Sequence, residues 1–254
     1  IESGGAIRHY LLERPQTDRV CFLVITSDKG LCGGHNSSVL DFVLSEILRL
    51  GKDKVDVVVV GKKGTDFLKH KGVNVVADFF GFGDFVKPAD TSPVARLLVS
   101  YQEKGTYAEV SVFYSKFIST LRQTVFTHSV LPFDFSKLRE IAKEIIPETG
   151  RYSDFKKDFL QEERTVGQSE YIFEPSAPAV FDSLLPMLFE IEIHSIMLEA
   201  NASEHSARMV AMKSASDNAK GIIGDLKLIY NTARQAGITK ELSEISAGAE
   251  ALKT

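Results

Sequence analysis

The sequence predicts an α/β protein in which a three-layer domain with a largely parallel sheet is followed by one long C-terminal helix. Short β-branched runs alternate with amphipathic stretches from residue 20 to about residue 133, the order that builds βαβ units. Hydrophobic residues make up 44% of the 254 positions, enough for a buried core. After Pro186 the remaining chain of about 68 residues contains no proline and is rich in residues that favour helix.

The β-branched runs are the predicted strands, and the amphipathic stretches are the predicted helices. The strands are 20–26, 55–60, 73–79 and 110–114, with a further one at 124–131. Two helices are expected at 36–50 and 64–71. A third is expected at 93–103, because Thr91 and Ser92 are available as caps before a proline suited to the first turn. These elements build a Rossmann-like domain.

We assign residues 1–175 to the α/β domain and residues 176–254 to the long helix. Within the domain, residues 134–169 are charge-dense without a clear period, which is typical of a surface insertion. Residues 171–175 have the pattern of a short return strand that ends at a proline. The chain beyond Pro186, as an unbroken helix, would reach on the order of 100 Å, several times the diameter of the domain.

A seam of apolar and small residues runs along the middle of the long helix. Its members recur at spacings that alternate between three and four, a heptad pattern that calls for a partner helix. The seam residues are Met212, Ala215, Ala219, Ile222, Leu226, Ile229, Ala233 and Ala236. Beyond Ala236 the register shifts by two residues, so the next apolar set turns to another face. That set is Ile238, Leu242, Ile245 and Ala249.

A row of basic residues lies beside the seam at intervals of seven. Its members are Lys213, Lys220, Lys227 and Arg234. The spacing places the four cations in one line along the helix. One interpretation is a solvated face. The chain carries 34 acidic and 30 basic residues, so a segregated basic row equally indicates an acidic partner surface.

Composition and spacing exclude several classes of function. The net charge of −4 draws the chain as a whole toward neither nucleic acid nor lipid. Cys21 and Cys32 form neither a disulfide framework nor a metal motif, which indicates a reducing compartment. No apolar run approaches the roughly 20 residues needed to cross a bilayer. No pair of histidines has helical metal spacing, so we expect no metal and no cofactor.

Two glycine-containing turns invite a phosphate-binding interpretation, because each follows a strand and precedes a helix. Residues 28–34 and 61–65 nevertheless lack both the Gly-Lys-Ser/Thr ending and the Gly-x-Gly-x-x-Gly spacing. We interpret both as structural turns, the first with a further contact to a partner. No Ser-His-Asp arrangement is singled out, so no catalytic residue is predicted.

Long ordered strings in the sequence resemble the gamma subunit of F-type ATP synthases. In the long helix they are 203–213, which reads Ser-Glu-His-Ser-Ala-Arg-Met-Val-Ala-Met-Lys, and 230–242, which reads Tyr-Asn-Thr-Ala-Arg-Gln-Ala-Gly-Ile-Thr-Lys-Glu-Leu. Earlier strings agree in the same order, at 27–36, 115–118, 131–132 and 171–175. The resemblance covers most of the chain from about residue 18.

This resemblance implies a non-catalytic central-stalk rotor subunit that couples proton-driven rotation to ATP synthesis or hydrolysis. The α/β domain would stand on the c-ring and hold the epsilon subunit, and the long helix would enter the alpha/beta hexamer. Contacts with the beta subunit are implied for Arg234, Gln235, Thr239 and Glu241. The implied location is peripheral, on the cytoplasmic face of a bacterial inner membrane or the matrix face of the mitochondrial one.

The family also begins with a helix that wraps the C-terminal helix as an antiparallel coiled coil, and the residues before Ile7 do not supply it. We therefore expect the natural chain to continue upstream. Two alternatives stay open. One is an enzyme whose α/β domain binds a nucleotide or phosphate, with a helical oligomerisation arm. The other is a coiled-coil adaptor whose long helix self-associates.

Overall fold

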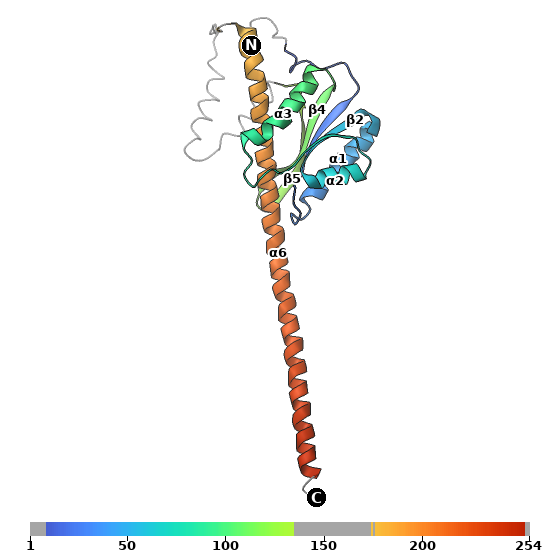
Figure 1. Cartoon of the computed structure of the whole chain (residues 1–254), viewed down its shortest axis with the longest axis vertical. Helices are drawn as coiled ribbons and strands as arrows, with labels where there is room; N and C mark the ends of the chain where they lie inside the picture. The colour runs from blue at the N-terminus through green and yellow to red at the C-terminus, as the bar shows by residue number, and fades with distance from the viewer. Residues whose placement is uncertain (1–8, 135–173, 175, 252–254) are drawn as a thin grey trace.

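The computed structural model describes residues 9–134, 174 and 176–251. An α/β domain lies at one end, and one helix runs along its side and then projects far beyond it (Figure 1). The C-terminus lies at the distal end of this helix, remote from the sheet.

The sheet contains five strands in the order β3-β2-β1-β4-β5. Their bounds are β1 (Val20–Ile25), β2 (Val55–Val60), β3 (Val75–Phe79), β4 (Glu109–Ser119) and β5 (Arg122–Leu131). β1 pairs in parallel with β2 and β4, and β2 with β3, whereas β5 is antiparallel to β4. The largely parallel sheet predicted from the sequence is confirmed.

One face of the sheet is covered by α1 (His35–Leu50) and α2 (Lys62–His70), with a short 3-10 turn, η1 (Lys52–Lys54), before β2. Phe22 and Val24 of β1 point to this face and pack in a cluster with Val43 of α1 and Leu68 of α2. Side chains alternate along a strand, so the neighbouring residues of β1 point to the opposite face.

The opposite face is covered by α3 (Pro88–Glu103) and the first part of α6 (Ala177–Ala251). Leu23 of β1 and Val112 of β4 lie here in one buried cluster with Leu98 of α3 and Phe189 of α6. The three layers are thus α1 and α2, the sheet, and α3 with α6. The beginning of the long helix is part of the domain core.

Helix α6 spans 75 residues, so its length is about 110 Å. It runs through Pro186, which lacks an amide hydrogen and would weaken an isolated helix. Phe181, Leu185 and Phe189 on either side of this proline are buried against the domain. Tertiary packing therefore holds the helix straight across the proline, a contribution that helix propensity does not include.

Several predicted bounds need correction. Helix α3 begins at Pro88 and contains Pro93, whereas the sequence pattern placed its start at Pro93 with Thr91 and Ser92 as caps. The start is set instead by Asp90, whose carboxylate accepts a hydrogen bond from the Lys87 amide at 2.9 Å. Strands β4 and β5 extend into a hairpin longer than predicted, because their outer ends pair with each other.

Other predictions fall on parts of the chain that the structure does not describe. The proposed insertion at 134–169 lies outside the described residues except for residue 134, as does most of the return strand at 171–175. The division at residue 175 stays a prediction, although α6 does begin at Ala177. Among the described helices, none has the length and apolar character required to span a membrane.

Candidate functional surface on the projecting helix

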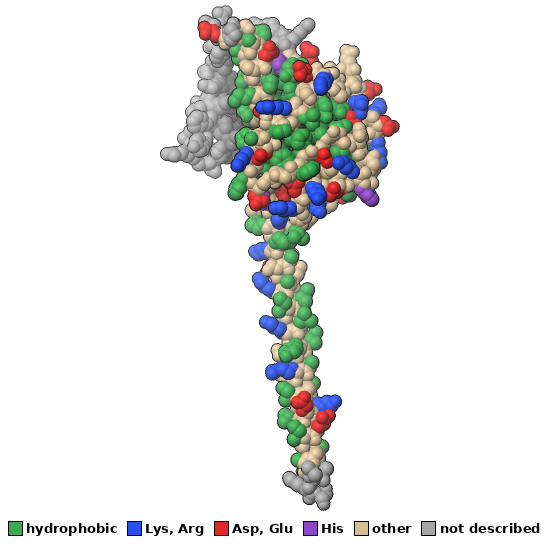
Figure 2. All heavy atoms as spheres, in the orientation of Figure 1, with side chains coloured by type: hydrophobic (Ala, Val, Ile, Leu, Met, Phe, Trp, Pro, Cys, Tyr) green, Lys and Arg blue, Asp and Glu red, His purple; other side chains and the backbone are tan. Residues whose placement is uncertain are grey.

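Helix α6 leaves the domain beyond Ala211, and every residue from Met212 to Ala249 is exposed. Figure 2 shows this stretch extending away from the domain into solvent. Its length is about 55 Å. An amphipathic helix in a folded protein normally buries its apolar stripe, so an exposed stripe of this length marks an interaction surface.

The predicted seam occupies one side of this exposed stretch. Its largest members, Ile222, Leu226 and Ile229, are 60%, 59% and 64% exposed. The alanines between them are exposed as well. Nothing in the described part of the chain covers the seam, so the structure leaves it available to a partner helix. The coiled coil itself stays a prediction.

The basic row lies on a different side of the helix. Each of its members follows a seam residue by one position and is therefore displaced from it by about 100° around the axis. In Figure 2 the Lys and Arg side chains form a column along one edge of the helix, with hydrophobic side chains along the other. Lys220 Nζ pairs with Asp217 Oδ1 at 3.2 Å. Within the described residues, Lys213, Lys227 and Arg234 make no ion pair.

The residues implied to contact a beta subunit are all exposed near the end of α6. Gln235 and Thr239 are four positions apart and Arg234 and Glu241 seven, so each pair lies in one line along the helix. Helical spacing places all four away from the seam that ends at Ala236. A helix that covered the seam would leave them accessible.

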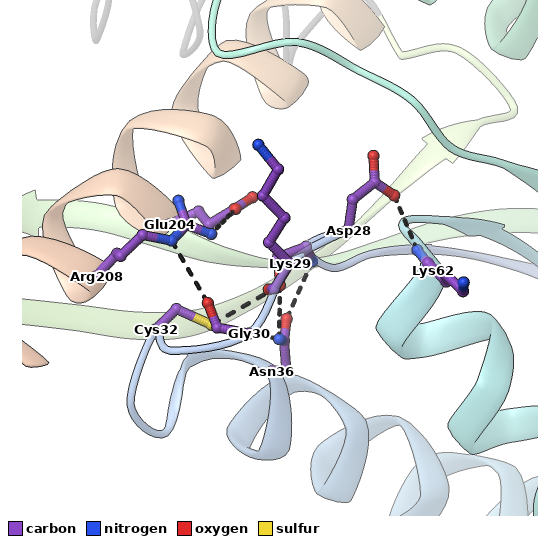
Figure 3. A network of polar contacts seen from close by, with 9 residues as sticks. Asp28, Lys29, Gly30, Cys32, Asn36, Lys62, Glu204 and Arg208 are labelled. Carbon is purple, nitrogen blue, oxygen red and sulfur yellow. Dashed lines mark hydrogen bonds and ion pairs between the residues drawn. The ribbon is translucent and has the colours of Figure 1, made fainter. Parts of the chain in front are cut away.

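The base of α6 is held by the turn between β1 and α1 (Figure 3). Arg208 pairs with the Glu204 carboxylate one turn earlier, and its Nε lies 3.5 Å from the Gly30 carbonyl oxygen. At Gly33 an added Cβ would lie 3.8 Å from the Ala211 Cβ, so the turn packs closely on the helix. The glycine-rich turn is therefore a structural support for α6.

The same turn is ordered by a set of internal hydrogen bonds (Figure 3). The Asn36 side chain accepts from the Ser27 amide at 3.0 Å and donates to Ser27 Oγ at 2.6 Å. It also lies 3.3 Å from Cys32 Sγ. Cys32 is buried within this network, so its thiol serves the packing of the turn.

The N-terminus of α2, where a phosphate would bind in many α/β enzymes, already holds a carboxylate. Asp28 accepts hydrogen bonds from the amide of Lys62 at 3.0 Å and from the amide of Gly81 at 2.7 Å. This places a negative charge at the positive end of the α2 dipole. A phosphate at the same position would meet that charge.

The remaining amides of the second turn are occupied in the same way. The Gly61 amide donates to the Phe79 carbonyl oxygen at 2.8 Å, and the Lys63 amide donates to the Ser27 carbonyl oxygen at 3.1 Å. The Gly64 amide donates to Thr26 Oγ1 at 3.0 Å. These amides are therefore not directed at a ligand. The hydrogen bonding of this second turn favours the structural interpretation over a phosphate cradle.

The histidines contribute contacts between α6 and the domain. His9 Nε2 lies 3.5 Å from Asp182, and His128 Nε2 lies 3.5 Å from the buried Glu192. Among the described residues, no cluster of His, Cys, Asp and Glu is arranged to hold a metal ion.

Sequence reasoning missed the polar contacts that hold α6 on the sheet. The clearest are Ser203, which is fully buried, and Ser206, which is 7% exposed. The spacing of these serines could have indicated their burial. Both follow Ala200 at intervals of three residues and so continue the buried face of the helix. A small polar residue on a buried face indicates a hydrogen-bond partner on the packed element.

Comparison with known proteins gives matches over almost the whole chain. A family model described as ATP synthase matches residues 2–252. The ATP synthase gamma chain of Heliobacterium modesticaldum is 38% identical over 252 residues, which cover 99% of this chain and 80% of that one. The gamma chain of Paracidovorax citrulli is 42% identical over 234 residues, which cover 91% and 73%.

Solved structures show the same fold. One is the central stalk and c-ring of the Tetrahymena thermophila mitochondrial ATP synthase, with a TM-score of 0.58 and 21% identity over 82% of each chain. Another is from the Euglena gracilis mitochondrial ATP synthase, with a TM-score of 0.61 and 15% identity over 99% of this chain and 82% of that one.

An α/β domain with a projecting helix whose apolar stripe is exposed to solvent defines a stalk-like subunit of a larger assembly. The sequence matches make the class specific. The chain belongs to the ATP synthase gamma-chain family and is a central-stalk subunit of the rotor.

Proposed function

We propose that α6 is the shaft that couples proton-driven rotation to the alpha/beta hexamer, and that the α/β domain is the foot on which it stands. The observation that carries this proposal is the uninterrupted exposure of α6 from Met212 to Ala249. A helix in water gains nothing from displaying this apolar surface. The stretch is therefore best explained as a surface that is covered in the assembled complex.

The seam supports pairing with a second helix of the same subunit. A single helix of this length bends readily, whereas two helices packed along a heptad seam stiffen each other. The alanines of the seam allow close approach of the two backbones. A stiff, slender rod is what a shaft inside a narrow cavity requires.

The basic row supports an electrostatic contact with the beta subunit. The row occupies a side of the helix that a partner on the seam would leave open. Three of its four cations make no ion pair in the described part of the chain, so they remain available to acidic side chains. Exposed ion pairs contribute only about 0.2–1 kcal/mol each. Such contacts are weak enough to be broken and remade as the shaft turns.

The tip of α6 presents a further combination of groups. Ile238 lies four positions beyond Arg234 and begins the second apolar set described above. This set therefore continues the line of the basic row along the helix. Arg234, Gln235, Thr239 and Glu241 lie on the sides that the seam does not use, and we assign them to contacts with the beta subunit.

The foot would contact the c-ring and the epsilon subunit. Support comes from the structural neighbours, which were observed in assemblies that contain the central stalk, F1 and the c-ring. The two gamma chains named above come from bacteria, which supports a location beside the cytoplasmic face of a bacterial inner membrane.

Co-purification of the full-length chain tests the proposal. Recovery in a defined complex with alpha and beta subunits is the expected result. A stable homodimer as the sole product would instead support a coiled-coil adaptor, and saturable nucleotide binding by the isolated chain would support an α/β enzyme. Either result, without recovery of the complex, would overturn the shaft assignment.

A further inference from the structure

We propose that a polar collar at the base of α6 fixes the rotational and axial position of the shaft on the foot and transmits torque between them. The collar consists of Glu199, Ser203 and Ser206 on α6 and their partners on β4 and the following turn. This inference rests on the proposed shaft function and adds the residues through which the foot grips the shaft.

The collar lies where α6 makes its last contacts with the sheet before it projects. Tyr114 Oη donates to Glu199 Oε2 at 2.6 Å. Ser203 Oγ donates to Ser115 Oγ at 3.0 Å. Both partners are on β4, on successive residues.

The third contact lies one turn further along the helix. Ser206 Oγ donates to the carbonyl oxygen of Thr120, in the turn between β4 and β5, at 2.9 Å. The α6 residues are spaced by four and three, so they form one line on the face toward the sheet. The shaft is thereby bonded to one hairpin at three points over two helical turns.

The apolar part of the interface restrains the helix in a different way. Apolar contacts such as those of Phe189 and Ile193 hold the helix on the sheet, but the hydrophobic effect has no preferred direction. A helix held by such contacts alone is restrained by the shapes of the packed side chains and not by bond direction. Hydrogen bonds weaken steeply when their angle changes, so they oppose both rolling and sliding of the helix.

A second set of contacts grips the opposite flank of α6. Ser92 of α3 donates to Glu190 Oε1 at 3.1 Å, and Thr91 Oγ1 lies 3.2 Å from His194 Nδ1. These lie nearer the beginning of α6, well above the point of exit. The collar lies nearer the projecting shaft than this second set, beside the contacts of Arg208 and Ala211 with the turn between β1 and α1.

The test measures angular fluctuations of a bead fixed to the foot in the reconstituted complex, while the hexamer holds the shaft in a catalytic pause. The test variant is Tyr114→Phe with Ser203→Ala and Ser206→Ala. The matched control is Ile196→Val, which trims a buried apolar contact of the same helix. We expect the angular variance to rise about twofold in the variant, because directional bonds are lost, and to stay at the wild-type value in the control.

Two single variants keep the test decisive if the triple variant does not assemble. Tyr114→Phe removes the donor and should raise the variance, whereas Glu199→Gln retains an acceptor oxygen and should not. Equal variance in Tyr114→Phe, Glu199→Gln and wild type would overturn the collar. A wild-type complex in which the foot does not rotate at all would overturn the shaft function itself, which is a separate result.

Discussion

The carboxylate of Asp28, which follows β1, accepts a hydrogen bond from the amide of Lys62 at the start of α2, at 3.0 Å. The other carboxylate oxygen accepts from the amide of Gly81, at 2.7 Å. One side chain thus joins the ends of β1, β2 and β3. The carboxylate lies at the positive end of the α2 helix dipole, at the carboxyl edge of the sheet.

Replacement of Asp28 by Ala should lower the free energy of unfolding by about 1–2 kcal/mol, because two amides lose a charged acceptor. Chemical denaturation of the isolated chain measures this. Asp41→Ala, at an exposed position of α1, is the control and should change stability little. A loss no greater than that of the control would show that the two hydrogen bonds contribute nothing net.

Gly61 provides a test of the close approach between β1 and the start of α2. A Cβ at Gly61 would lie 2.2 Å from the Thr26 carbonyl oxygen, and the residue has φ 99°. Gly51 has φ 97° but no atom within 4 Å of the same built Cβ, so it isolates the cost of the backbone conformation. We expect Gly51→Ala to cost about 1 kcal/mol and Gly61→Ala to cost more than about 3 kcal/mol in thermal unfolding. Equal costs would contradict the contact.

Burial, together with the nearby guanidinium of Arg208, lowers the pKa of His35 from 6.5 to about 4. The unfolded chain therefore binds more protons than the folded one between these values. The contribution of this shift to the free energy of unfolding is fully present above pH 6.5. It is lost as the pH falls toward 4, and the total loss is about 3 kcal/mol.

Urea unfolding at pH 7, 6 and 5 measures this dependence. In His35→Gln the fall in stability should be shallower by up to about 1.4 kcal/mol per pH unit. The exposed His70→Gln serves as the control and should follow the wild type. Parallel curves for all three proteins would rule out His35 as the source.

The seam is tested by a pair of leucines that differ in position and little in exposure. Leu226 lies in the seam and is 59% exposed, and Leu228 lies outside it and is 69% exposed. Leu226→Asp should reduce recovery of the assembled complex, because a buried leucine contributes about 1.5–3 kcal/mol. Leu228→Asp should reduce it less. Both isolated variants should unfold at the wild-type temperature. A larger assembly defect for Leu228→Asp would place the covered face elsewhere.

The tip residues are tested by charge reversal. Arg234→Glu combined with Glu241→Lys should lower coupled ATP synthesis in vesicles, because both side chains lie on faces that a partner on the seam leaves open. The α/β domain should remain folded, since neither residue contacts it. Unchanged synthesis would remove these two residues from the proposed contact with the beta subunit.

Much of the fold was predictable, because the hydrophobic period of a strand or a helix depends only on residues that are close together in the sequence. The runs at 20–26 and 55–60 became β1 and β2 almost unchanged, and the proline-free C-terminal chain became α6. The start of α3 was not predictable in the same way. Prolines at 88 and 93 are both compatible with a first turn, and the choice depends on a cap made by Asp90.

The seam and the basic row were visible from spacing alone, since heptad patterns need no tertiary information. The contacts that hold α6 on the foot were not. Ser203 and Ser115 are 88 residues apart in the chain, and nothing in either segment specifies the other. Glu192 was similarly unremarkable in sequence, although it is buried beside His128. Long-range polar pairs require the packed structure.

The most direct test of the shaft function is rotation of the foot in the assembled complex. A bead attached through Ser45→Cys, on the exposed side of α1, should turn in one direction when ATP is supplied to a surface-fixed alpha/beta hexamer. Continuous rotation with ATP, and none without it, is the predicted result. ATP hydrolysis at the full rate with a stationary bead would contradict the account.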